Sequence, residues 1–97
     1  MLVGIPREIK VHEYRTGLTP ASVRELTLRG HSVMVETSLG AAIGLGDEQY
    51  AAAGARILPA ARDIWDRAEL IVKVKEPQAA ERALLREGQV LFTYLHL

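Results

Sequence analysis

The sequence contains no cysteine, and this absence excludes disulfide bonds and every metal site built on thiolates. Aromatic residues are scarce as well, at 5% of the 97 residues. Twelve basic residues balance twelve acidic ones, so the chain has no net charge with which to attract nucleic acid or an anionic membrane. Any preference for an anionic ligand must therefore come from a few Lys or Arg side chains gathered at one site.

Long hydrophobic runs are also missing. No apolar stretch approaches the roughly 20 residues that span a bilayer, and the opening MLVGIPREIK lacks the apolar core of a signal peptide. Apolar residues make up 48% of the chain and charged residues 25%, which are the proportions of a globular domain. We therefore expect one soluble, cytoplasmic domain that has neither nucleic acid nor a membrane as a partner.

Apolar runs alternate with helical patterns along the chain. The expected strands are Leu2–Ile5, His31–Glu36, Ala55–Leu58, Glu69–Val74 and Gln89–Leu95. The expected helices run from Pro20 to a stop at Gly30, and over Glu48–Ala53, Ala60–Ala68 and Ala79–Arg86. This alternation predicts a three-layer α/β fold, with a mostly parallel five-stranded sheet and helices on both faces.

Local signals refine these elements. Thr19 is the expected N-cap of the first helix, because Pro20 is suited to the first helical position. Asp47 is the expected cap of the second helix. Leu84 and Leu85 are expected to point inward from the last helix. Lys73 shares a face of its strand with a second lysine two residues on, and we expect Lys73 to face solvent at the strand edge.

Three residues are expected at one edge of the sheet. In open parallel sheets, ligands bind outside the carboxyl ends of the strands. Arg15 lies in the long loop after the first strand, Lys75 follows the fourth strand and His96 follows the fifth. A guanidinium and an ammonium suit a small carboxylate, and an imidazole exchanges protons near neutral pH. This set favours a site for a small 2-oxo or 2-amino acid, whereas His31 belongs to the opposite edge.

Other interpretations stay open. His96 shares a strand face with aromatic residues, so it is equally well explained as a packed, hydrogen-bonded core histidine. The glutamates Glu8, Glu13 and Glu76 fit either as site residues or as counter-charges for the cations. The glycines of TSLGAAIGLG do not match G-x-G-x-x-G, so we interpret this segment as a flexible surface loop and expect no cofactor-binding residues here. The three histidines have no metal-ligand spacing, and we expect no metal.

Four ordered segments carry a resemblance to a known family: GIPREIKVHEYRTGLTP, VETSLGAAIGLGDEQYAAAGA, IVKVKEP and VLFTYLHL. They resemble the N-terminal region of L-alanine dehydrogenases, which belong with the pyridine nucleotide transhydrogenases to one family. The resemblance implies NAD-dependent interconversion of L-alanine with pyruvate and ammonia. It implies that Arg15 binds the substrate carboxylate, that Lys75 contacts the carboxylate or keto oxygen, and that His96 is the proton donor and acceptor.

The same resemblance implies a larger protein. Residues 1–97 would form the N-terminal part of a flavodoxin-like or Rossmann-like substrate-binding domain, and NAD would bind a Rossmann domain absent from this chain. The complete enzyme would be a homo-oligomer, commonly a hexamer, and the isolated chain would be inactive. The chain stops directly behind an apolar strand, which favours the same view. The alternatives are a saccharopine dehydrogenase-like protein, a transhydrogenase alpha chain, or a non-catalytic anion-binding module.

Overall fold

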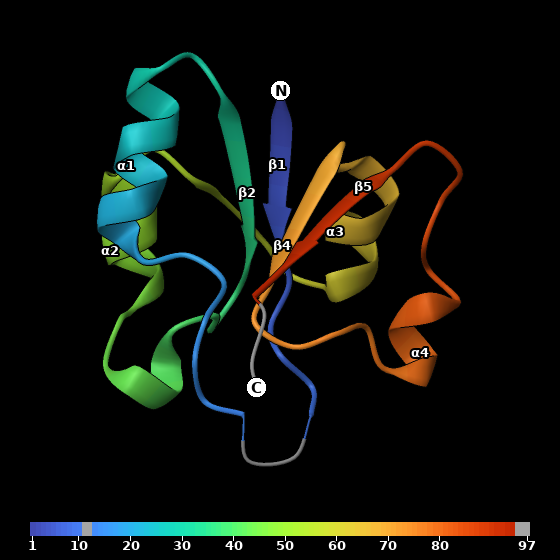
Figure 1. The fold of residues 1–97 in the computed structure, drawn as a ribbon. Helices are drawn as coiled ribbons and strands as arrows, with labels where there is room; N and C mark the ends of the chain where they lie inside the picture. The colour runs from blue at the N-terminus through green and yellow to red at the C-terminus, as the bar shows by residue number, and fades with distance from the viewer. Residues whose placement is uncertain (11–12, 95–97) are drawn as a thin grey trace.

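Five parallel strands form one sheet in the order β3-β2-β1-β4-β5 (Figure 1). The computed structural model describes residues 1–10 and 13–94. The strands are β1 (Leu2–Ile5), β2 (Ser32–Glu36), β3 (Arg56–Leu58), β4 (Leu70–Lys73) and β5 (Val90–Thr93). All four strand pairs run parallel, which confirms the sheet predicted from the sequence.

Helices lie on both faces of the sheet, as predicted (Figure 1). They are α1 (Pro20–Leu28), α2 (Asp47–Ala52), α3 (Ala61–Arg67) and α4 (Ala79–Arg82), with a short 3₁₀ helix, η1, at Ala41–Ile43. The helices α1 and α2 cover one face, and α3 and α4 lie on the other. Within the described residues, none of them has both the length and the apolar character needed to cross a membrane.

Two hydrophobic clusters join the three layers. On the α1 and α2 side, buried side chains of β1 and β2 pack against Val23 and Tyr50. On the other side, Met34 and Ile71 of the sheet pack against Ile64 and Trp65 of α3. These four helix residues have no exposed surface, so each helix is held by the burial of one apolar face.

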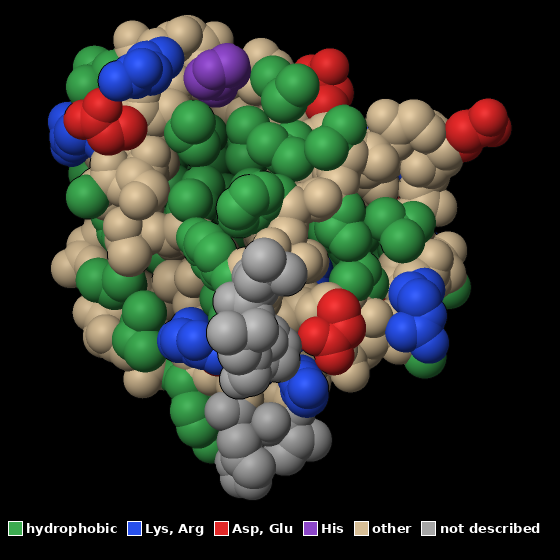
Figure 2. Space-filling model, viewed as in Figure 1, with side chains coloured by type: hydrophobic (Ala, Val, Ile, Leu, Met, Phe, Trp, Pro, Cys, Tyr) green, Lys and Arg blue, Asp and Glu red, His purple; other side chains and the backbone are tan. Residues whose placement is uncertain are grey.

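The side chains of the outer strand β5 are less buried than those of its neighbour β4. In the parallel register, Val72 of β4 lies beside Phe92 of β5. Val72 belongs to the buried cluster on the α1 and α2 side, whereas Phe92 and Val90 are about half exposed. Figure 2 shows hydrophobic side chains gathered at the surface over the strands.

The start of α1 matches its sequence signal, but the start of α2 does not. The Thr19 side chain accepts a hydrogen bond from the Ser22 backbone N–H, which confirms Thr19 as the N-cap. Asp47 is the first residue of α2 rather than its cap. Its carboxylate accepts from the Thr37 hydroxyl at 2.6 Å and from the Ser38 N–H at 2.8 Å. Asp47 therefore ties α2 to the end of β2 instead of capping its own helix.

Two further expectations were wrong. Helix α4 ends at Arg82, well before the predicted Arg86, and Leu85 is 38% exposed while only Leu84 packs against the α3 side. The glycine-rich segment was expected to be a plain surface loop, but it contains regular local structure. It contains η1, and its ends are joined by a bridge between Gly40 and Leu45.

The strand order creates a topological switch point at the carboxyl edge of the sheet. β1 pairs with β2 on one side and with β4 on the other. The chain leaves β1 toward α1 on one face, and it leaves β4 toward α4 on the other face. In such sheets, ligands bind where two adjacent strands continue into connections on opposite faces of the sheet. The segments with the predicted site residues Arg15 and Lys75 are these two connections.

Candidate functional site

The loop that carries Arg15 is fixed onto the ends of β4 and β5. Gly17 is buried, and a Cβ at this position would come within 2.7 Å of the Val72 carbonyl oxygen. The Tyr94 hydroxyl donates a hydrogen bond of 2.6 Å to the Gly17 carbonyl. Only glycine allows this close approach to β4, so the sequence places Arg15 next to the β4 end.

Arg15 is held along one edge by a carboxylate. Its Nε donates to Glu13 Oε2 at 2.9 Å, and its Nη2 donates to Glu13 Oε1 at 2.8 Å. The Arg15 backbone N–H also donates to Glu13 Oε2. This two-point contact fixes the guanidinium plane. The Arg15 side chain is 61% exposed while that of Glu13 is only 5% exposed, so the fixed guanidinium still faces solvent.

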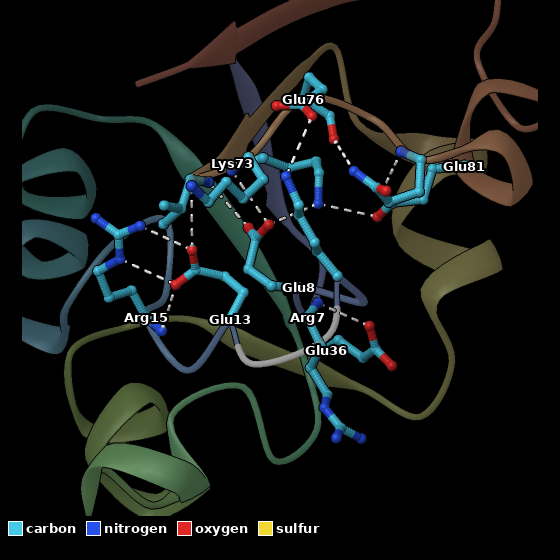
Figure 3. Close-up of polar contacts among 12 residues, drawn as sticks. Arg7, Glu8, Glu13, Arg15, Glu36, Lys73, Glu76 and Glu81 are labelled. Atoms are coloured by element: carbon cyan, nitrogen blue, oxygen red, sulfur yellow. Dashed lines mark hydrogen bonds and ion pairs between the residues drawn. The ribbon is translucent and has the colours of Figure 1, made fainter. Parts of the chain in front are cut away.

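Lys75 reaches the same carboxylate. Its Nζ lies 3.9 Å from Glu13 Oε1, and its side chain is 17% exposed. Figure 3 shows Arg15 turned toward Glu13 from the side opposite to Glu8. Two cations thus share one carboxylate in the Arg15–Glu13–Lys75 cluster. The exposed guanidinium of Arg15 suits a ligand with a single carboxylate.

The charge of Glu13 is stabilised by its neighbours. The side-chain hydrogen bond from Arg15 lowers the pKa of the Glu13 carboxyl the most, and the backbone hydrogen bond and the charges of Arg15 and Lys75 lower it further. Desolvation opposes them, and the pKa falls from 4.5 to about 2. The same contact raises the pKa of Arg15. Glu13 therefore stays ionised at neutral pH.

This pKa predicts an unusual acid titration. A depressed carboxyl pKa contributes stability that is present above the unfolded pKa and is lost as the pH falls through the folded pKa. The contribution of Glu13 should hold at pH 5 and disappear between about pH 4.5 and pH 2. Carbon-detected NMR of the Glu13 carboxyl measures this directly. A midpoint near 4.5 would contradict the contact with Arg15.

Behind this cluster lies a buried ion triad that the sequence did not reveal. Lys73 was expected to face solvent, but its side chain is only 1% exposed. Its Nζ lies 2.9 Å from Glu8 Oε1 and 3.0 Å from Glu81 Oε2. The error arose because the partners come from other elements: Glu8 lies in the loop after β1 and Glu81 lies in α4. Figure 3 shows these carboxylates on two sides of the Lys73 chain end.

Two neighbouring clefts open beside Arg15. One of about 370 Å³ is lined by Arg7, Lys10 and Glu13 from the β1 loop, and by residues 38, 39, 41 and 42 across from it. The other, about 270 Å³, is lined mainly by apolar atoms, with Val74 and Tyr94 among its residues. Arg15 lines both clefts. A small carboxylate at its free face would therefore contact a charged wall on one side and an apolar wall on the other.

The expected site residues can now be placed. Arg15 and Lys75 lie at one edge and meet at Glu13, as the position of their segments in the sheet predicted. His96 lies outside the described residues. The three glutamates take separate roles: Glu8 pairs with Lys73, Glu13 holds the two site cations, and Glu76 lies 3.6 Å from Lys10. His31 lies at the opposite edge, where its Nδ1 is 3.2 Å from the N-terminal amine.

The first glycine of the 3₁₀ segment does not form an open phosphate cradle. A phosphate cradle needs glycine backbone open to the ligand. The glycine at the start of η1, Gly40, is instead buried, and a Cβ there would meet the Leu45 backbone and the Tyr50 ring. The described part of the chain also holds no group of three acidic, histidine or cysteine side chains arranged for a metal.

Comparison with known proteins agrees with this geometry. Residues 4–97 match the family model described as "Alanine dehydrogenase/PNT, N-terminal domain". An alanine dehydrogenase from Halomonas elongata is 55% identical over all 97 residues. A solved L-alanine dehydrogenase structure superposes with a TM-score of 0.94 at 51% identity over 99% of the chain. A transhydrogenase structure from Sinorhizobium meliloti superposes with a TM-score of 0.89 at 33% identity over 98% of the chain.

These matches involve only part of each relative. The chain spans about a quarter of the length of the curated relatives it matches, with 26% of the Halomonas protein covered. The same holds for the solved structures, of which 26% and 28% are covered.

Proposed function

This chain belongs to the alanine dehydrogenase/PNT N-terminal domain family, and from that premise we propose that it is the substrate-binding part of an NAD-dependent L-alanine dehydrogenase. The relatives support a dehydrogenase role and a pyridine nucleotide cofactor. The proposed reaction is the interconversion of L-alanine with pyruvate and ammonia. We assign residues 1–97 to the N-terminal part of the substrate-binding domain, and the cytoplasmic hexamer expected from the resemblance belongs to the same proposal.

The Arg15–Glu13–Lys75 cluster is the observation that carries this proposal. Pyruvate and alanine each have one carboxylate, and Arg15 presents an exposed guanidinium that can bind it. Glu13 occupies the Nε edge of Arg15, so the exposed remainder of the guanidinium is available to the substrate. The apolar cleft beside Arg15 suits a methyl group rather than a second charged group. The site thus favours a short 2-oxo or 2-amino acid.

The proposed roles follow from this placement. Arg15 binds the carboxylate, and Lys75 contacts the carboxylate or the keto oxygen, where it stabilises negative charge as ammonia adds to the carbonyl. His96 supplies and accepts protons while the carbinolamine forms and loses water. The nicotinamide cofactor supplies the hydride in this class of reaction. We assign its binding to the longer protein, because this sequence contains no G-x-G-x-x-G motif.

Activity of the full-length protein tests the proposal. We expect NADH oxidation that requires both pyruvate and ammonium, measured at 340 nm. The combination of 2-oxoglutarate and lysine is the control for a saccharopine dehydrogenase-like reaction, and hydride exchange between two nicotinamide cofactors is the control for a transhydrogenase. The isolated residues 1–97 serve as a further control and should oxidise no NADH. Pyruvate binding without turnover of any of these substrates would instead favour the anion-binding module.

A further inference from the structure

We propose that Glu8 is a positioning residue of the carboxylate site. Its buried carboxylate fixes the backbone at residues 74 and 75, and with it Lys75, relative to the loop that carries Glu13 and Arg15. The inference rests on the proposed function, because it concerns the same site. It adds a residue that touches no proposed reacting group and acts through Lys75.

Both oxygens of Glu8 are engaged by the end of β4. Oε1 accepts from Lys73 Nζ at 2.9 Å and from the Lys75 N–H at 3.3 Å. Oε2 accepts from the Val74 N–H at 2.9 Å. The Glu8 side chain is 2% exposed, so water does not compete for these contacts. A single side chain therefore holds three consecutive residues, the last of which is the proposed substrate ligand Lys75.

This contact joins the two halves of the site. Glu8 lies in the loop after β1, and the residues it holds are 65 to 67 positions away in sequence. Glu13 continues the same loop and contacts both Arg15 and Lys75. The loop is thus attached to the 73–75 segment at two places. The distance between the guanidinium and the ammonium depends on both attachments.

Stability alone does not explain a buried triad of this kind. Removing three charged side chains from water is costly, and apolar residues of similar volume often give equal or greater stability. Charged networks do fix a unique geometry when every member is satisfied. Here all four carboxylate oxygens have partners, since Glu81 Oε1 accepts from the Gln78 N–H and Glu81 Oε2 contacts Lys73. The triad lies directly behind Lys75, where fixed geometry matters for substrate binding.

Glu81 provides a matched control within the same triad. It contacts the same Lys73 Nζ at a nearly equal distance and is buried to a similar degree. Its other hydrogen bond goes to the start of α4 rather than to residues 74 and 75. A purely structural role of the triad would make the two glutamates equivalent. If Glu8 has a positioning role, substitution of Glu8 should affect the substrate site more than substitution of Glu81.

The test compares Glu8→Gln with Glu81→Gln in the full-length protein. Glutamine turns one acceptor of Glu8 into a donor, which then faces the Val74 N–H or the Lys73 and Lys75 donors. We expect Glu8→Gln to raise KM for pyruvate about tenfold or more, since small displacements at a site cost up to about a hundredfold. KM for NADH should stay within about twofold, and Glu81→Gln should change both values little. Glu8→Asp, which keeps a charge beside Lys73 but is shorter, should also raise KM for pyruvate.

Amide exchange gives a readout that does not depend on activity. Hydrogen exchange at Val74 and Lys75 should accelerate in Glu8→Gln and Glu8→Asp but not in Glu81→Gln. Equal changes in KM and in exchange for the Glu8 and Glu81 variants would overturn the positioning role. If the wild-type protein shows no pyruvate turnover, the proposed function fails by itself. The exchange pattern then decides whether Glu8 still fixes residues 74 and 75.

Discussion

Replacing Lys73 with methionine should lower the stability of the sheet edge by about 3–5 kcal/mol, as expected when one member of a buried ion cluster is removed. Methionine fills much of the lysine volume but leaves the Glu8 and Glu81 carboxylates facing each other without a cation. Both side chains are at most 5% exposed, so water cannot replace the ammonium without opening the loop. Native-state hydrogen exchange at the amides of β4 in the full-length protein measures the loss.

A triple variant separates charge imbalance from loss of the contacts. Lys73→Met combined with Glu8→Gln and Glu81→Gln removes all three charges at once. It should recover a large part of the lost stability, because neutral replacements of a buried ion cluster are often nearly neutral in free energy. Equal stability of Lys73→Met and the wild type would show that the triad is hydrated. A triple variant no better than the single one would show that packing dominates.

The burial of Lys73 could not be predicted from the sequence. The strand β4 was predicted from its apolar residues, and the same pattern indicated that a lysine at its end would face solvent. Burial of Lys73 depends on Glu8 and Glu81, and nothing in the local sequence links these residues to β4. Local periodicity predicts strands and helices because it reflects contacts with the adjacent layer. Pairing between distant charged residues leaves no periodic signal.

The other differences have related causes. The Leu84–Leu85 pair continues the apolar pattern of a helix, but only Leu84 finds a place against the α3 side, and α4 ends at Arg82. Asp47 is of a residue type that often caps helices. Its carboxylate instead accepts hydrogen bonds from Thr37 and Ser38, which follow β2. In both cases a tertiary contact replaces the local one that the sequence favoured.

The site itself was partly predictable. Arg15 and Lys75 were placed together because carboxyl ends of parallel strands meet at one edge, and both reach Glu13 there. The role of Glu13 was not predictable, since three glutamates near the cations were equally good partners. Only the geometry separates the residue that holds the site cations from Glu8 and Glu76.

Replacing His96 with alanine in the full-length protein should lower kcat by about 10²–10⁴-fold, the usual contribution of a general acid–base residue. The prediction rests on the sequence position of His96, which lies outside the described residues. The last described residues before His96 lie beside the proposed site. Thr93 pairs in register with Lys73, and the Tyr94 hydroxyl donates to Gly17 in the Arg15 loop. Stopped-flow kinetics with pyruvate, ammonium and NADH measures the loss.

His31 is the matched control for this experiment. It is a histidine at the amino edge of the sheet, where it contacts the N-terminal amine rather than the Arg15 loop. His31→Ala should leave kcat within about twofold of the wild type, since a change at the opposite edge of the sheet, far from the site, affects little. NADH binding, followed by fluorescence, should be unchanged in both variants, because no residue of this chain is assigned to the cofactor. Near-normal turnover by His96→Ala would contradict the acid–base role. It would favour the packed core histidine instead, and carboxylate binding by Arg15 and Lys75 would then account for this chain's whole contribution.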